Sequence, residues 1–368
     1  MVLVMAKTVA ECEANPEMHA SDFEHLGRLL RETSRTFALS IEGLPEALRE
    51  ELTVSYLLFR VSDYLEDHSS IDAPTKTSLL RHWERVLASD DSLDSFVRAL
   101  NTIPHRSDDP EAVVAYESGR LLAHTAAFPK ASRDAIIRRV RETTLGMAEW
   151  QEKGPRVESE KELDEYMHYV AGIVGYLVTD LFAGQSDRIS RRKADLMPLA
   201  REFGLALQTV NVIRGVRKDY ERGWIFVPHS FCRAHGISQD ELFDPGNERS
   251  GVEVINDLVA KAETHLVGAL AYVRSLPRRM HRLRLACAWP LLFAARTLSA
   301  SRNNAAVLTG EVKVGRHEIK AIMKRSAILG WSNAWLGHYT EKLLRRTPLV
   351  PRGARDRPAA GSHATTGK

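Results

Sequence analysis

Several features that mark specialised classes of protein are missing from this sequence. Its three cysteines, Cys12, Cys232 and Cys287, are far apart and lack the spacing of a metal site. We therefore expect no disulfide framework and favour a reducing, cytoplasmic location. The net charge of +3 over 368 residues is too small to indicate a nucleic-acid partner. A nucleotide-binding glycine fingerprint is also absent, as is any internal repeat.

The sequence is also short of long apolar runs. Its first residues have neither the charged start nor the apolar core of a signal peptide. The longest apolar stretch, LACAWPLLFAARTL, has about 14 residues and contains Pro290, whereas a transmembrane helix needs about 20. We expect this stretch to form a buried helix, and we expect no transmembrane segment.

Composition changes only near the two ends of the chain. We expect residues 1–20 to form an N-terminal tail and residues 21–344 to form one domain, as a monomer. Residues 345–368 are rich in Pro, Gly and Arg, which predicts a disordered basic tail. Such a tail either stays solvated or touches an anionic membrane surface, so peripheral membrane contact stays open.

Between these tails, apolar residues recur at intervals of three and four, which is typical of amphipathic helices. SDFEHLGRLLRETSRTFALSIEGL and VEVINDLVAKAETHLVGALAYVRSL are two examples, and breaks such as GLPEAL and DPGNERS indicate loops. No segment alternates as a strand would. The sequence therefore predicts an all-α fold.

The stretch YLLFRVSDYLEDH contains the first chemical candidate. Tyr56, Arg60, Asp63 and Asp67 follow one another at intervals of four, three and four, so they share one helix face, with Glu66 beside them. Two carboxylates one turn apart can hold hard divalent cations together with water and phosphate. A solvated acidic helix end would have a similar sequence. Here, however, the residues that precede the acids are apolar on nearly every face of the helix. That pattern favours the end of a buried helix.

A second candidate is QTVNVIRGVRKDYERGWIFVP. Gln208, Asn211, Gly215 and Asp219 lie on one helix face, and Asn211 and Asp219 can supply oxygen ligands to Mg²⁺. The cations around them can pair with phosphate: Arg214, Arg217, Lys218 and Arg222. A helix that ends in solvated basic residues is the alternative.

A third segment, DEYMHYVAGIVGYLVTDLF, places Gly172 and Gly175 beside Ala171 in an apolar helix. Because glycine destabilises a helix by about 1 kcal/mol relative to alanine, the two glycines indicate either close helix packing or a path for a ligand.

Together and in this order, the motifs resemble the squalene and phytoene synthase family of head-to-head prenyltransferases. The resemblance extends from SRTFALSI (34–41) to VKVGRHEIKAIM (312–323). DYLED and NVIRGVRKDYERGWIFVP match the two aspartate-rich motifs of the family. YMHYVAGIVG is most similar to squalene synthases, whereas ERGWIFVP is closer to phytoene synthases. The resemblance implies the isoprenoid synthase fold, a single helical domain around a central cavity.

The same resemblance implies roles for individual residues. Asp63, Asp67 and Asp219, with Glu66, correspond to Mg²⁺ ligands, and Tyr166 corresponds to a tyrosine that assists proton removal and shields a cation. The implied binding site for prenyl diphosphate substrates consists of Arg35, Phe37, Tyr56, Arg60, Val170, Val174, Gln208, Arg214 and Arg222.

The second motif departs from the family pattern at two positions. Gly215 and Lys218 stand where acids are expected, so one metal ligand is missing. Either Asn211, one turn earlier on the same face, takes over coordination of Mg²⁺, or Lys218 contacts the diphosphate directly.

The implied reaction condenses two farnesyl diphosphates through a cyclopropyl (presqualene) diphosphate, which NADPH then reduces to squalene. Lys313 matches a lysine linked with NADPH. The arginine expected two positions later is Gly315, with Arg316 beside it. Two alternatives remain: a phytoene or dehydrosqualene synthase that performs no reduction, and a non-catalytic member that acts as an assembly or binding factor.

Overall fold

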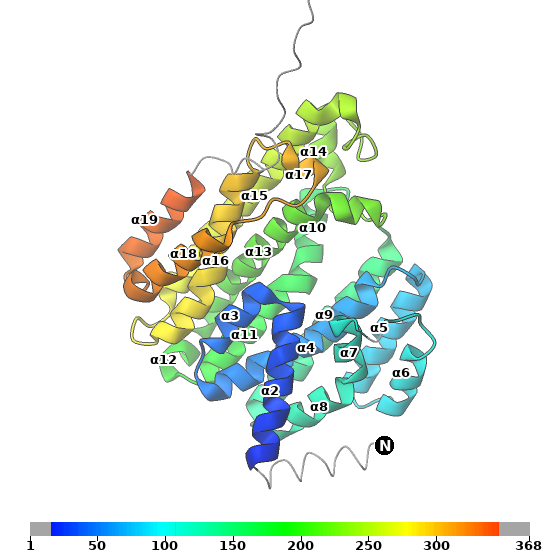
Figure 1. The fold of residues 1–368 in the computed structure, drawn as a ribbon, viewed down its shortest axis with the longest axis vertical. Coiled ribbons are helices and arrows are strands. Elements are labelled where there is room, and N and C mark those ends of the chain that lie inside the picture. The colour runs from blue at the N-terminus through cyan, green and yellow to red at the C-terminus, as the bar shows by residue number, and fades with distance from the viewer. Residues whose placement is uncertain (1–15, 107, 346–368) are drawn as a thin grey trace, which may run out of the picture.

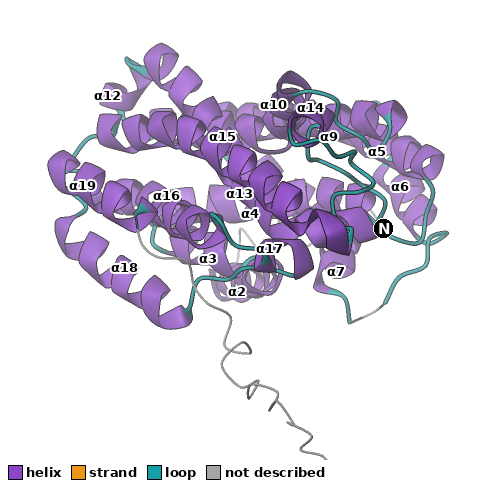
Figure 2. Ribbon diagram, turned by 90° about the horizontal axis from the view of Figure 1, so that it is seen from above, coloured by secondary structure: helices purple, strands orange, loops and turns teal. Residues whose placement is uncertain are grey.

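A computed structural model describes residues 16–106 and 108–345, with side chains described from Ser21 onward except that of Arg35. Within these residues every regular element is a helix, apart from one isolated β-bridge between Arg156 and Ile225 (Figure 1, Figure 2). The all-α prediction is confirmed. Cys12 and the predicted basic tail 345–368, except its first residue Arg345, lie outside the described residues.

Six helices form the centre of the molecule, because each carries a broad apolar face. They are α4 (Glu46–Asp67), α9 (Lys130–Lys153), α11 (Ile173–Gly184), α13 (Lys193–Glu221), α15 (Glu248–Ser275) and α16 (His281–Ser301). α13 packs along α15 and α11, while α4 packs on α9. The predicted buried helix is confirmed, since LACAWPLLFAARTL forms most of α16 and is almost entirely buried.

Other helices cover this centre (Figure 1). On the α4 and α9 side they are α2 (Pro16–Thr33), α3 (Arg35–Glu42), α5 (Ala73–Leu87), α6 (Leu93–Leu100), α7 (Pro110–Tyr116) and α8 (Ser118–Ala127). On the other side they are α12 (Asp187–Ser190), α14 (His229–Ala234), a 3₁₀ turn (Pro245–Asn247), α17 (Ala306–Thr309), α18 (Arg316–Leu329) and α19 (Asn333–Leu344).

The glycine-rich segment is a continuous helical run with a π-helical turn in its middle. α10 (Glu160–Met167) leads into the π turn η1 (His168–Gly172) and then into α11. A Cβ atom on Gly175 would lie 2.2 Å from the carbonyl oxygen of Ala200, and one on Gly204 would lie 2.3 Å from that of Ala171. No side chain fits at either position, so the backbones of this run and α13 touch. Gly175 thus satisfies the close-packing explanation, and it lines the central cavity as well; a Cβ atom on Gly172 would instead meet side chains, with His168 Nδ1 2.6 Å away.

The run Glu160–Gly184 reaches the length and mean hydropathy of a membrane span. It is also the segment that contacts α13 and lines the central cavity. Those two contacts account for its apolar composition without a membrane.

Candidate active site

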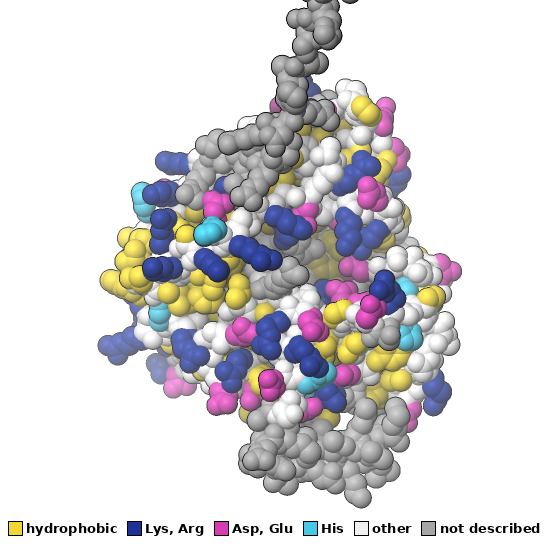
Figure 3. All heavy atoms as spheres, viewed as in Figure 1, with side chains coloured by type: hydrophobic (Ala, Val, Ile, Leu, Met, Phe, Trp, Pro, Cys, Tyr) yellow, Lys and Arg dark blue, Asp and Glu magenta, His cyan; other side chains and the backbone are white. Residues whose placement is uncertain are grey.

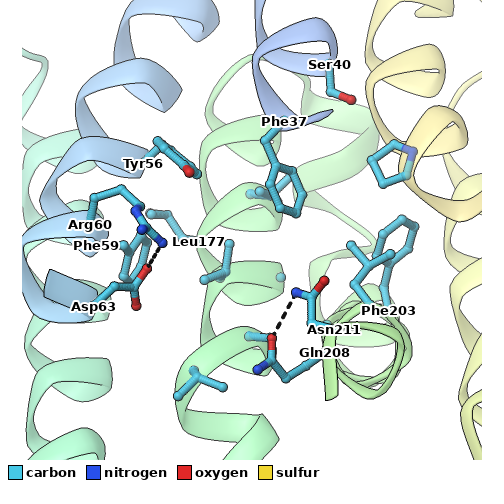
Figure 4. A pocket seen from close by; sticks show the side chains of 18 of the residues that line it. Phe37, Ser40, Tyr56, Phe59, Arg60, Asp63, Leu177, Phe203, Gln208 and Asn211 are labelled. Carbon is cyan, nitrogen blue, oxygen red and sulfur yellow. Dashed lines mark hydrogen bonds and ion pairs between the residues drawn. The ribbon is translucent and has the colours of Figure 1, made fainter. Parts of the chain in front are cut away.

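The central helices enclose a cavity of about 500 Å³ (Figure 4). α4 and α13 both run from its apolar end to its charged end. The apolar end is lined by Phe37, Ile41, Leu44, Leu177, Phe182, Phe203, Cys287 and Pro290. The charged end is lined by Arg60, Asp63, Glu66, Asp67, Asn211, Lys218, Asp219 and Arg222. Such a cavity fits a long apolar molecule with a charged head.

The first acidic motif occupies the last two turns of α4, where the buried helix ends. Arg60 donates to Asp63 over 2.8 Å and also pairs with Glu111 of α7. Burial raises the pKa of Asp63 to about 6, with the neighbouring Asp67 and Glu111 adding to the rise against the attraction of Arg60. Sequence reasoning did not find Glu111, because only the tertiary fold brings α7 beside α4.

Glu66 is buried next to this pair. Burial raises its pKa well above the ordinary value, and the charges of Asp67 and Asp63 raise it further. Lys76 of α5 lies close by, but its ammonium group donates to the backbone carbonyl of Glu66 over 2.7 Å rather than to the carboxylate. The end of α4 is therefore rich in negative charge that its neighbours compensate only in part.

The second motif lies on the cavity face of α13, as its spacing predicts. Asn211 donates from Nδ2 to Gln208 Oε1 over 3.2 Å (Figure 4). Arg222 joins the two motifs, because it donates to Asp219 over 2.6 Å and to Asp67 over 2.9 Å. Burial raises the pKa of Asp219, against the attraction of Arg222.

The cations around the second motif divide into two groups. Lys218 and Arg222 line the cavity. Arg217 turns away and pairs with Glu221 over 2.7 Å, and Arg214 pairs with Glu311 outside the residues that line the cavity. The predicted set of phosphate-binding cations is thus only partly brought together.

These acids suit a hard divalent cation in chemistry but are not gathered into a closed cluster. Among the residues described, no group of three or more His, Cys, Asp or Glu side chains is close enough to hold one ion. Arginines stand between the carboxylates instead, with Arg60 on Asp63 and Arg222 between Asp67 and Asp219. Burial raises the pKa values of Asp63, Glu66 and Asp219. Carboxylate oxygens that line one end of the cavity suit Mg²⁺ as donors, although arginines occupy them in this structure.

Tyr166 is buried in an aromatic stack beside these acids. Its ring stacks on Phe226 at 4.5 Å and meets Trp150 edge-on at 5.4 Å, and Phe226 in turn stacks on Trp224 at 5.5 Å. Burial raises the pKa of Tyr166 well above its ordinary value, and the charges of the nearby acids add to the rise. Phe226 was not predicted, although the GWIFVP that follows the second motif was a signal for it.

The other predicted substrate-binding residues lie mostly where expected. Phe37, Tyr56, Val170, Val174 and Gln208 line the cavity, with Tyr56 donating its hydroxyl to the carbonyl of Thr33 over 3.3 Å. Arg35 begins α3, but its side chain is outside the described set.

The predicted NADPH-binding residues lie in the loop that precedes α18 and at the start of α18 itself. Lys313 pairs with Glu311 over 2.7 Å, and the same carboxylate pairs with Arg214, so this loop is attached to α13. Although burial opposes it, hydrogen bonding from Lys313 and the charge of Arg214 lower the pKa of Glu311. Arg316 is exposed at the first position of α18, and neither it nor Lys313 lines the cavity.

Comparison with known proteins agrees with this architecture. The family model for squalene/phytoene synthase matches residues 30–318. Squalene synthases of Schizosaccharomyces pombe and Homo sapiens are each 28% identical to this chain, over 82% and 87% of it and over 64% and 73% of their own lengths. The complex of TcSQS with the ligand BPH1237 superposes with a TM-score of 0.74 at 27% identity, covering 92% of this chain and 94% of that one. The predicted isoprenoid synthase fold is confirmed, and the chain belongs to the squalene/phytoene synthase family.

Proposed function

We propose that this protein condenses two farnesyl diphosphates head to head into presqualene diphosphate and reduces this intermediate with NADPH to squalene. The observation that carries the proposal is the cavity, which is apolar at one end and lined by acids and cations at the other. The similarity to squalene synthases adds support. The cellular form would be a cytoplasmic monomer with peripheral membrane contact, and two cysteines that are buried and free agree with a reducing compartment.

The charged end would bind the diphosphate. Asp63, Glu66, Asp67, Asn211 and Asp219 would hold Mg²⁺, which neutralises the charge that develops on the departing diphosphate. Arg60, Lys218 and Arg222 face the same space and can donate to diphosphate oxygens. The pairs that Arg60 makes with Asp63 and Glu111 hold its guanidinium at the rim of this end.

The apolar end would hold the prenyl chains and keep water from the allylic cation. Tyr166 lies where the two ends meet, because it is close enough to the acids for their charge to raise its pKa. With that raised pKa its hydroxyl stays protonated at neutral pH, so its ring shields the cation while its hydroxyl acts as a hydrogen-bond partner. The proton that the substrate loses would then be accepted by the departing diphosphate, not by a Tyr166 phenolate.

The reduction step is assigned to the loop before α18. Lys313 would bind a phosphate of NADPH, with Arg316 as the nearest arginine to the expected position. A synthase that performs no reduction is the second candidate, because Gly315 stands where the family arginine is expected and ERGWIFVP is closer to phytoene synthases.

The test is to incubate the purified protein with farnesyl diphosphate and Mg²⁺, with and without NADPH, and to identify the lipid product by mass spectrometry. We expect squalene with NADPH and presqualene diphosphate without it. Dehydrosqualene in both reactions would support the non-reducing candidate, and phytoene from geranylgeranyl diphosphate would do the same. Absence of diphosphate release from either substrate would indicate a non-catalytic binding factor.

A further inference from the structure

An apolar corner lies where α18 turns into α19, formed by Ile328, Leu329 and Trp331. Their side chains are 64%, 40% and 51% exposed, and among the described residues the only other large apolar residue so exposed is Val267 of α15, at 70%. In the space-filling view, hydrophobic side chains gather over the region of α18 and α19, with dark blue cations around them (Figure 3). Three adjacent large apolar side chains in water call for an explanation, whereas one alone does not.

Basic side chains surround the apolar corner. Lys324 and Arg325 stand one helical turn before Ile328 and Leu329, and Lys320 stands one turn earlier still. All three cations are exposed, and none forms an ion pair with an acid in the part of the chain that is described. Residues 316–345 hold six Lys or Arg against two Glu, whereas the whole chain holds 51 against 48. This hairpin therefore carries a net charge of +4 (six minus two), and the sequence after it is basic as well.

The loop between α15 and α16 adds two further cations, Arg278 and Arg279, both exposed. The first turn of α16, which follows this loop directly, is held against the corner, because His281 hydrogen-bonds the carbonyl of Ala327 over 2.8 Å and Arg284 donates to that of Gly330 over 3.3 Å. Burial lowers the pKa of Arg284, and the charge of Arg278 lowers it further.

We propose that the apolar corner and its basic surround dock on the surface of an anionic lipid bilayer. Large apolar side chains bury themselves at the boundary of headgroups and acyl chains, while Lys and Arg around them pair with lipid phosphates. A second copy of the chain fits this surface less well. A symmetric pair would bring the same cations face to face, and such a contact is repulsive.

Docking there would have a consequence for the cavity, one that depends on the proposed function. Trp289 of α16 donates to Ser326 of α18 over 3.0 Å, so this face of α16 packs on α18. The next residue, Pro290, lines the apolar end of the cavity together with Ala286 and Cys287. Docking would place the apolar end of the cavity on the membrane side of the molecule, where a hydrocarbon product leaves most easily.

The test is co-sedimentation of the full-length protein with vesicles of phosphatidylcholine alone and of phosphatidylcholine mixed with phosphatidylglycerol. We expect binding to the anionic vesicles only, weakened by 0.5 M salt because salt screens the cations (Debye length about 4 Å at this concentration). Ile328→Ser combined with Trp331→Ser should lower the partition coefficient by about tenfold or more. Val267→Ser removes an equally exposed apolar side chain elsewhere and is the matched control, with no change expected. Lys324→Glu combined with Arg325→Glu should remove the preference for anionic vesicles.

Three outcomes would overturn the proposal. The first is equal binding to neutral and anionic vesicles. The second is full binding by the Ile328 and Trp331 double variant, which would assign membrane contact to another part of the chain. The third is a lipid-free dimer, detected by light scattering and abolished in the double variant, which would make the corner a contact between copies. The melting temperature and diphosphate release in lipid-free solution should be unchanged in every variant, and these controls separate a failure of docking from a failure of the proposed function.

Discussion

The replacement Gly215→Asp tests whether a metal ligand has moved along α13. Gly215 lies on the cavity face between Asn211 and Asp219, where the family places an acid. A Cβ atom there would be 3.0 Å from Asp219 Oδ2, which belongs to a side chain that can rotate and not to backbone. The helix itself should gain a few tenths of a kcal/mol, because Asp is a better helix former than Gly. We therefore expect the variant to fold.

The electrostatic effect of Gly215→Asp on the site should change from unfavourable to favourable when Mg²⁺ binds. Without the ion, two carboxylates about 4 Å apart at an effective dielectric constant of 20 repel by at most about 4 kcal/mol. Arg222, which is 2.6 Å from Asp219, offsets part of that repulsion. With the ion, both carboxylates become ligands. A gain of about 1.4 kcal/mol in binding would lower the Mg²⁺ concentration for half-maximal rate about tenfold.

The assay is diphosphate release from farnesyl diphosphate, titrated with Mg²⁺, in the natural protein, Gly215→Asp, Asn211→Ala and the double variant. Asn211 makes one hydrogen bond, to Gln208, among the described residues, so its removal should disturb the fold little. Asn211→Ala should raise the Mg²⁺ requirement several-fold in the natural protein and much less in the Gly215→Asp background. Two groups that share one ion must couple, typically by about 0.5–3 kcal/mol.

Gly184→Asp is the matched control, since a Cβ atom there would meet nothing within 4 Å. It reports the effect of Gly to Asp in a helix away from the charged end. Strictly additive effects of the two site variants would refute shared coordination. Loss of activity in Gly215→Asp at an unchanged Mg²⁺ requirement would also refute it, and would show that the glycine makes room for substrate.

Four further variants probe the rest of the molecule. Asp63→Asn should abolish diphosphate release. The melting temperature should shift by only a few degrees, because the amide still accepts a hydrogen bond from Arg60. Full activity would remove the first motif from the mechanism. Tyr166→Phe keeps the aromatic stack, so turnover should fall while equilibrium binding of the diphosphate is retained; loss of both would make it a packing residue. Glu311→Gln should weaken the attachment of the loop to α13 and raise the KM for NADPH, with presqualene diphosphate formation unchanged; an unchanged KM would separate the loop from the cofactor. Burial lowers the pKa of His265, but the carboxylates of Glu202, hydrogen-bonded over 2.6 Å, and of Asp164, 3.3 Å away, outweigh it and raise this pKa above 6.5. The contribution of His265 to stability should therefore be complete below pH 6.5 and lost as the pH rises through the folded-state pKa, and urea unfolding of His265→Gln should lack that loss.

The spacing of residues along the sequence predicted those features of the site that depend on a single helix. The four-residue intervals at Asp63, Asp67 and Asp219 place these acids on the inner faces of α4 and α13, and the structure puts all three on the cavity. The all-α fold followed from the same periodicity. Both inferences succeed because helix geometry relates sequence spacing directly to direction.

Contacts between distant segments could not be predicted from the spacing of residues within one helix. Glu111 reaches Arg60 from another helix, and Phe226 stacks on Tyr166 from a loop, so neither is visible from its own neighbours in sequence. Arg214 was predicted to lie in the site but lies outside it. Its charge suggested a diphosphate ligand, but its side chain leaves the cavity for Glu311, about a hundred residues away in the chain.

The arginine bridges also bear on how the proposed substrate and ion would bind. Arg222 is shared between Asp67 and Asp219, so it neutralises groups proposed as metal ligands while it is itself proposed to bind diphosphate. A diphosphate that attracts Arg222 frees both carboxylates for Mg²⁺, and an ion held by the carboxylates frees Arg222 for the diphosphate. Each event removes a competitor of the other, so the two must bind cooperatively and with equal effect in both directions. Lys218, which stands in this chain where the family pattern has an acid, strengthens this linkage. It places a cation beside Arg222, whereas an acid at this position would attract Arg222 and hold it more firmly.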